Sequence, residues 1–213
     1  MRAHETNRPG ALPRSRRSAR QVAKGVANRS LRGMVLPLVL TMRAQQRLVG
    51  PERADGVFQT YSQLLSLVPG LAGEYARRAF YRLTLPHCGE DFTVGFGTVF
   101  SKQGVVVGQR VYIGMGCTIG HAWLGDHVTI GSNVDLLSGK EQHRFDDLDQ
   151  PVQDQGGRYS TVRVGDNSWL GNGTIVMADI GAGCVVGAGS VVQSALPDRV
   201  IAVGNPARVV RQR

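Results

Sequence analysis

Aromatic side chains are scarce in this sequence. Phe, Trp and Tyr make up 6% of its 213 residues, whereas Gly alone occurs 28 times. The buried apolar surface must therefore come mainly from aliphatic side chains. The many glycines indicate a chain with many tight corners. At this length we expect one domain with attachments.

Cysteines and long apolar runs are also lacking. Cys88, Cys117 and Cys184 leave one thiol unpaired in any disulfide scheme. Because Cys117 and Cys184 occupy inward positions of the repeat described below, we expect buried thiols in a reducing cytoplasm rather than a disulfide-rich secreted scaffold. The apolar run 34–42 contains Pro37. It is too short to span a bilayer and lacks the clear small-residue cleavage site of a signal peptide. The alternative for this run is an amphipathic segment that lies on a membrane surface.

Acidic residues are nearly absent from the first 33 residues. This segment holds nine Lys and Arg residues against Glu5 alone, which leaves 16 basic and 15 acidic residues in the rest of the chain. The net charge of +9 therefore belongs to an N-terminal arm, and we expect no nucleic acid partner. The Arg, Ser and Pro content of the arm predicts disorder. The arm is either a solvated extension or a cationic segment that contacts a membrane surface.

A six-residue phrase recurs from about residue 94 to the C-terminus. It consists of an aliphatic residue, usually Gly, and then small or polar residues. Its clearest copies begin at Val107, Ile113, Ile119, Leu124, Ile130, Val164, Leu170, Ile180 and Val186. A fixed short period is the signature of a solenoid, whose repeats bury their apolar side only by stacking on one another.

One phrase shows how the repeat folds. In the copy that begins at Val164, the aliphatic side chain and the small Ser168 share the interior, while Gly, Asn and Asp tolerate the positive φ of a tight corner. Three phrases make one triangular coil, and roughly six coils spaced at about 4.8 Å make a prism about 30 Å tall. The sequence therefore predicts an all-β solenoid, a parallel β-helix of hexapeptide repeats.

Apolar residues recur at helical spacing before the first coil. One candidate helix covers 57–68 and a second covers about 71–83. Because an open solenoid end exposes unpaired strand edges, we interpret this pair as a helical cap, with a substrate-recognition module as the alternative. The predicted organisation is a basic arm that is disordered or peripheral, a helical cap, and a β-helix domain: residues 1–50, 51–86 and 87–213.

The repeat is interrupted once at length. After Leu136 the chain enters a polar stretch rich in Asp and Gln and resumes the repeat near Val162, which predicts a long extruded loop over 138–161. The loop contains His143. Imidazole titrates near neutral pH, so His143 is a candidate proton acceptor, although a solvated loop histidine is the simpler interpretation of the residue alone.

Together, the repeats, the looped His143 and three short segments resemble the hexapeptide-repeat acyltransferases, in particular the branch of sugar O-acetyltransferases and exopolysaccharide-associated acetyltransferases. The three segments are Trp169-Leu170-Gly171, Val186-Gly187-Ala188-Gly189-Ser190-Val191-Val192 and Gly204-Asn205-Pro206-Ala207-Arg208. The resemblance covers about 94–211. It implies a left-handed β-helix that forms a homotrimer, with an active site in each groove between neighbouring prisms. It also implies transfer of an acetyl group from acetyl-CoA to a hydroxyl of a sugar or polysaccharide precursor, in the cytoplasm or at a membrane periphery and without a metal.

The resemblance further implies roles for single residues. The matching residues are His143 as general base, Gln142 and Trp169 beside the acceptor, Asn172 and Ala188 along the pantetheine, and Arg208 and Arg211 at the cofactor phosphates. A guanidinium group suits the last role because it binds phosphate in a bidentate way. Each role has a plainer alternative: Trp169 as a filler of a subunit interface, and the two arginines as an ordinary basic C-terminus.

The chain also departs from the family pattern. Gln193-Ser194 stands where the family often has Thr-Lys, and the phrase Val176-Met177-Ala178-Asp179 is shorter than the period. His121 and His127 raise a rival interpretation, a zinc enzyme like the γ-class carbonic anhydrases, although the two residues occupy different places in their phrases. A noncatalytic β-helix scaffold is the third alternative.

Overall fold

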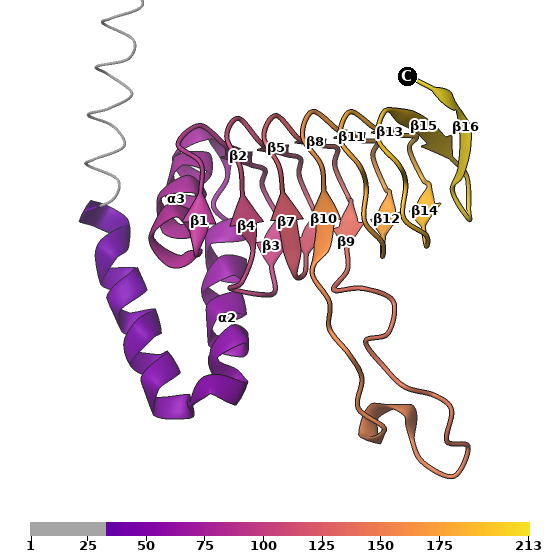
Figure 1. The fold of residues 1–213 in the computed structure, drawn as a ribbon. Helices are drawn as coiled ribbons and strands as arrows, with labels where there is room; N and C mark the ends of the chain where they lie inside the picture. The colour runs from indigo at the N-terminus through magenta and orange to yellow at the C-terminus, as the bar shows by residue number, and fades with distance from the viewer. Residues whose placement is uncertain (1–32) are drawn as a thin grey trace, which may run out of the picture.

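The computed structural model describes residues 33–213, and from residue 87 onward the chain winds into a solenoid (Figure 1). Three parallel sheets form its sides. The largest sheet has seven strands, one of which is antiparallel. The six remaining parallel strands, one for each coil, confirm the predicted solenoid and its predicted size.

Each sheet collects one short strand from successive coils. Sheet A contains β1 (His87–Cys88), β4 (Val106–Val107), β7 (Ala122–Leu124) and β10 (Val162–Val164). Sheet B contains β2 (Thr93–Val94), β5 (Tyr112–Ile113), β8 (Thr129–Ile130), β11 (Trp169–Leu170), β13 (Val185–Val186), β15 (Val200–Val203) and the antiparallel β16 (Arg208–Gln212). Sheet C contains β3 (Val99–Phe100), β6 (Thr118–Ile119), β9 (Asp135–Leu136), β12 (Ile175–Val176) and β14 (Val191–Val192). We call the three corners of the prism the A–B, B–C and C–A edges.

The solenoid core consists of aliphatic columns. On sheet B, for example, Ile113, Ile130 and Leu170 are fully buried and stack in register. The predicted buried thiols are confirmed, because Cys117 and Cys184 are buried and free. Burial raises the pKa of the Cys117 thiol. Aliphatic side chains thus fill the prism, as the scarcity of aromatics requires.

The corners use more residue types than the sequence indicated. Besides glycines and asparagines, Arg110, His127 and Arg199 on the A–B edge adopt φ values of 55° to 59°. Each stands at the same place in its coil. The backbone N–H of His127 donates to the Gln109 carbonyl, and that of Arg199 donates to the Ala182 carbonyl. Stacking between coils therefore imposes the corner conformation against the local preference of these residues.

The predicted helical cap is present as α2 (Ala54–Ser66) and α3 (Gly70–Thr84), preceded by the short η1 (Pro51–Arg53). Its side chains satisfy backbone groups on the open face of the first coil. Arg77 donates to the Val94 carbonyl at 2.9 Å, Arg78 donates to the Phe92 carbonyl at 2.6 Å, and the Phe100 N–H donates to the Ser62 hydroxyl at 2.9 Å. The two helices therefore close the solenoid end, as a cap requires.

The helical part of the molecule begins earlier than expected. Residues 33–49, assigned from sequence to the basic arm, are helical. The side chains of Val35, Val39 and Met42 are buried in the hydrophobic core cluster. The cap therefore extends upstream of the expected boundary at residue 50. The rest of the proposed arm, 1–32, lies outside the described residues.

The far end of the solenoid is closed by β16, which turns back and pairs with β15. It covers the last strand edge of sheet B with an exposed strand. Between residues 33 and 213, no helix has the length and apolar character needed to cross a membrane.

Candidate functional site

The long loop emerges from the C–A edge of the prism. The chain leaves the solenoid after β9 and rejoins it at β10, so the predicted loop 138–161 is present where expected (Figure 1). The loop carries one short helix, η2 (Val152–Asp154). Despite the insertion, β10 pairs in register with β7. The loop is therefore an addition to an unbroken stack of coils.

A two-stranded stem fixes the base of the loop. The Ser160 N–H donates to the Ser138 carbonyl at 2.9 Å, and the Arg158 N–H donates to the Glu141 carbonyl at 2.7 Å. Farther from the prism, the Arg144 N–H donates to the Gly156 carbonyl at 2.9 Å. His143 lies between the last two of these hydrogen bonds, which limit the positions that its backbone can take.

Gly157 is part of this stem for a steric reason. A Cβ at this position would collide with the carbonyl oxygen of Gln142 and would lie 2.9 Å from the His143 amide nitrogen. The two arms of the stem can approach so closely only because residue 157 has no side chain. Sequence reasoning missed Gly157, although the Gly156-Gly157 pair was visible as the end of the polar stretch.

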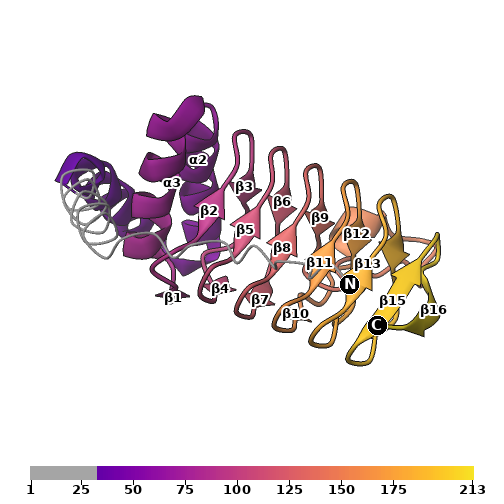
Figure 2. The ribbon, with the colours of Figure 1, turned by 90° about the horizontal axis from the view of Figure 1, so that it is seen from above.

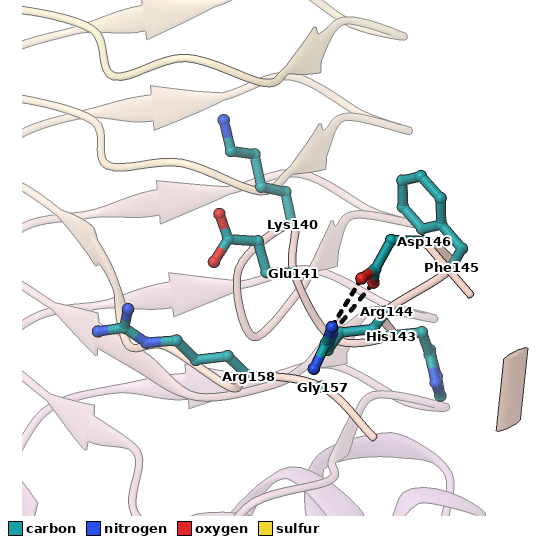
Figure 3. Close-up of a pocket in the computed structure, with 8 residues that line it drawn as sticks. All are labelled: Lys140, Glu141, His143, Arg144, Phe145, Asp146, Gly157 and Arg158. Carbon is teal, nitrogen blue, oxygen red and sulfur yellow. Dashed lines mark hydrogen bonds and ion pairs between the residues drawn. The ribbon is translucent and has the colours of Figure 1, made fainter. Parts of the chain in front are cut away.

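His143 borders a pocket of about 510 Å³. The other lining residues are Lys140, Glu141, Arg144, Phe145, Asp146, Gly157 and Arg158. In Figure 3, Glu141 and Arg158 lie on one side of the stem, and the His143 imidazole lies on the other. A further hollow on the loop is lined by His143, Pro151, Val152 and Gln153. The imidazole is thus exposed to space that a small molecule can enter.

An ion pair orders the segment that follows His143. Arg144 donates two hydrogen bonds to the Asp146 carboxylate, one of them from Nη2 at 2.6 Å. These hydrogen bonds lower the pKa of Asp146 and raise that of Arg144. Both side chains are well exposed, so the pair contributes little to overall stability. Its effect is local, on the loop wall next to His143.

The shortened phrase lies next to the stem of the loop. Met177 and Ala178 line a second pocket of about 490 Å³ together with Gln193, Ser194 and the loop stem residue Arg158. The next coil has the same short turn at the C–A edge, between Val192 and Leu196. The two departures from the family pattern therefore meet at one place.

Three predicted site residues lie on other sides of the prism. Trp169 projects from β11 on sheet B with 53% of its surface exposed. Asn172 and Ala188 stand one above the other on the B–C edge, where the Gly189 N–H donates to the Asn172 carbonyl. The Asn172 Oδ1 also accepts a hydrogen bond from the Ser132 N–H at 2.9 Å. The structure thus brings together the two residues expected along the pantetheine.

The two predicted phosphate-binding arginines are on β16. Arg208 stands opposite Val203 and Arg211 opposite Ile201 at the C-terminal end of sheet B, and both are exposed. A Cβ on Gly187 would contact the Val203 side chain, so Arg208 stands close to the B–C edge near Ala188. Arg211 lies further along the same strand.

Within one chain, the predicted site is divided between opposite sides of the prism. Sheet B faces the viewer in Figure 2, whereas the loop with Gln142 and His143 extends from the opposite side, as Figure 1 shows. Trp169 therefore cannot approach His143 of the same chain. A site that uses both halves requires two chains.

The histidines that suggested a zinc enzyme are also apart. His121 stands at the C–A edge, where its N–H donates to the Ser138 hydroxyl, and His127 stands at the A–B edge. Burial lowers the pKa of His121. Among residues 33–213, no three His, Cys, Asp or Glu side chains are grouped as metal ligands. His121 and His127 are therefore not stacked on one another.

Comparison with known proteins agrees with the fold. A family model described as the hexapeptide repeat of succinyl-transferase matches residues 161–194. This chain is a hexapeptide-repeat protein. The hexapeptide repeat on which the resemblance depends is thereby confirmed for these residues.

Curated relatives and solved structures extend this finding. The hexapeptide-repeat protein is 33% identical over 174 residues to a probable acetyltransferase of Mycobacterium tuberculosis, a match that covers 65% of this chain and 56% of the relative. The chain spans about half the length of the curated relatives it matches. The solved maltose O-acetyltransferase of Clostridium difficile superposes with a TM-score of 0.64 at 25% identity, covering 74% of this chain and 87% of that one.

A galactoside acetyltransferase solved in complex with coenzyme A shares the fold, with a TM-score of 0.62 and 22% identity over 74% of this chain and 82% of that one. These neighbours are left-handed β-helices. The predicted fold class, including its hand, is therefore confirmed.

Proposed function

We propose that this hexapeptide-repeat protein is an acetyl-CoA-dependent O-acetyltransferase whose acceptor is a hydroxyl of a sugar or polysaccharide precursor. The similar proteins named above are acetyltransferases, and one of them is a maltose O-acetyltransferase. The observation that carries the proposal is the loop that holds His143 beside an open pocket on a hydrogen-bonded stem. The buried free thiols Cys117 and Cys184 favour a reducing compartment, the cytoplasm.

We further propose that the working unit is a homotrimer with one site in each groove between subunits. Large apolar side chains are exposed on sheet B and the B–C edge: Phe96, Tyr112, Met115 and Trp169 each expose between 43% and 56% of their surface. Exposed apolar groups gathered on one side of a protein favour contact with a partner. A neighbouring subunit on this side would bring its own His143 loop to Trp169, Asn172 and Ala188.

The proposed reaction is a direct transfer. His143 accepts the proton of the acceptor hydroxyl while that oxygen attacks the thioester carbonyl carbon. Backbone N–H groups stabilise the oxyanion of the tetrahedral intermediate. The carbon–sulfur bond then breaks, and the imidazolium returns its proton to the thiolate of coenzyme A. Gln142 and Trp169 hold the acceptor, Asn172 and Ala188 border the pantetheine, and Arg208 and Arg211 bind the phosphates.

Release of free thiol from acetyl-CoA in the presence of a panel of sugars tests the reaction. We expect one class of sugar hydroxyl to support turnover, and His143→Ala to lower kcat/KM with that acceptor by about 10²- to 10⁴-fold. The matched control is His127→Ala, which removes an imidazole from the A–B edge. Full turnover by the His143→Ala protein would refute the assigned base.

Mixing two inactive variants tests the shared site. Each proposed site combines the B–C edge of one chain with the His143 loop of its neighbour. Ala188→Arg blocks the B–C edge, and His143→Ala removes the base from the loop. In trimers assembled from both chains at random, about one groove in four combines two native halves, so we expect about a quarter of the wild-type activity. Mixing His143→Ala with Gln142→Arg, which lies in the same half, should restore nothing. Equal failure of both mixtures would contradict a site built from two chains.

A further inference from the structure

The helix formed by residues 33–49 has two apolar sides. One side, with Val35, Val39 and Met42, packs into the core. The second side, which we call the outer stripe, consists of apolar residues spaced about one helical turn apart. It is offset by one position from the buried side and comprises Leu36, Leu40, Ala44 and Leu48. All four residues are exposed, Leu40 by 57% and Leu48 by 86%. A helix face of this kind favours an apolar environment.

The charge around the outer stripe has one sign. Residues 33–49 contain Arg43 and Arg47 and no acidic residue. Arg47 stands one position before Leu48 and is exposed, whereas the Arg43 guanidinium donates to the Leu83 carbonyl at the foot of the cap. The 32 residues that precede the helix add nine Lys and Arg residues against Glu5. The apolar stripe is therefore continuous in sequence with the most cationic part of the chain.

We propose that the outer stripe binds the surface of an anionic lipid bilayer, with the helix lying in the interface. Apolar side chains enter the boundary between headgroups and acyl chains, and neighbouring basic residues are attracted to anionic lipid. Strong positive charge beside the stripe fits this partner, because it would oppose the approach of a second copy that carries the same charge. None of the helices between 33 and 213 can span the bilayer, and the proposal places this helix on the membrane surface.

The position of the helix suits this role. It stands at the cap end of the molecule, on the outer side of α2 and α3 (Figure 1). Binding there holds the enzyme at the membrane while leaving the loop 138–161 and the B–C edge accessible. This inference goes beyond the proposed transfer reaction and does not depend on it.

Sedimentation of the full-length protein with lipid vesicles tests the proposal. The vesicles contain phosphatidylcholine alone or with phosphatidylglycerol added, at low and high salt. The test variant is Leu40→Glu/Leu48→Glu. The matched control is Leu64→Glu on α2, since Leu64 is 55% exposed and thus close to Leu40 in accessibility. Thermal unfolding and light scattering establish that each protein is folded and report its oligomeric state.

The wild type and Leu64→Glu should bind anionic vesicles, weakly at high salt, and binding by the double variant should fall at least about tenfold. If Leu40→Glu/Leu48→Glu unfolds, Leu40→Ser/Leu48→Ser serves the same purpose. Equal binding by all variants, or no binding by the wild type, overturns the proposal. So does a change of oligomeric state on altering the stripe, which would identify a second copy as its occupant. Thiol release with a soluble acceptor is measured in the same samples, so a failure of the transfer reaction is seen separately.

Discussion

The coils and the loop of this hexapeptide-repeat protein hold their residues in different ways. In the coils, the strands bond to strands one coil away, and every sheet runs through successive coils. Hydrogen bonds made by residues 139–158 have their partners inside the loop. Stability is therefore concentrated in the stack, and the candidate base is in a segment that contributes little to it. Substitutions in the two regions should have separable effects.

The largest effect on stability is expected in the stack. Ile130 is fully buried between Ile113 and Leu170. Ile130→Ala should lower the free energy of unfolding by about 2 to 5 kcal/mol, through lost burial and the cavity left behind. Denaturant unfolding measures this change, and acetyl transfer per folded molecule should stay near the wild-type value. A loss of activity without a loss of stability would break the proposed separation.

The open end of the stack is the next most sensitive place. Arg77 is buried and donates to the carbonyls of Leu65, Val68 and Val94 at 2.8 to 3.0 Å. Burial lowers the pKa of Arg77. Arg77→Met leaves these carbonyls without their donors and should cost about 1 to 3 kcal/mol in a denaturant titration. Arg82→Met removes only a long ion pair to an exposed partner and should stay within about 0.5 kcal/mol of wild type.

In the loop, a small change should affect activity more than stability. Gly157→Ala places a methyl group against the Gln142 carbonyl and moves the backbone of His143. We expect kcat/KM to fall by about tenfold, because catalytic groups tolerate little displacement, while the unfolding midpoint stays close to that of wild type. Gly56→Ala, in a helix with open space around its Cβ, is the control and should change neither activity nor fold. An unfolded Gly157→Ala protein would show that the loop is part of the stack after all.

The smallest effect is expected from the Arg144 and Asp146 pair. Hydrogen bonds from Arg144 lower the pKa of Asp146 below its ordinary value of 3.8. The pairing is therefore complete at neutral pH and is lost as the pH falls through the lowered pKa. Any difference in thermal unfolding between wild type and Asp146→Asn should be small at pH 7 and should disappear in acid. A difference that grows as the pH falls would contradict the pairing.

Sequence reasoning captured what is encoded by local periodicity. The coils, the buried Cys117 and Cys184, the cap helices and the ends of the loop all follow from the spacing of apolar and small residues. The corner conformations of Arg110 and Arg199 were missed, because contacts with neighbouring coils impose them. The packing of residues 33–49 was also missed, since the predicted arm extended to residue 50 and the composition of its basic first part indicated disorder.

The candidate site was also only partly predictable, because local periodicity encodes some of its contacts and not others. The vertical stacking of Asn172 and Ala188 follows from the period of the repeat. The placement of Trp169 opposite the loop does not, because it depends on which of three sheets each phrase joins. The stem around His143 does not follow from the repeat either, because the contact between Gly157 and Gln142 is not encoded by any short-range pattern.

The register of β10 on β7 has an evolutionary consequence. Val162 pairs with Ala122 as though the intervening loop were absent. Lengthening such a loop costs little, since each doubling adds only about 0.6 kcal/mol of closure entropy. The segment that carries His143 can therefore diverge in length and composition without loss of a strand pair. Related prisms can in this way change the proposed acceptor site while keeping the proposed cofactor edge.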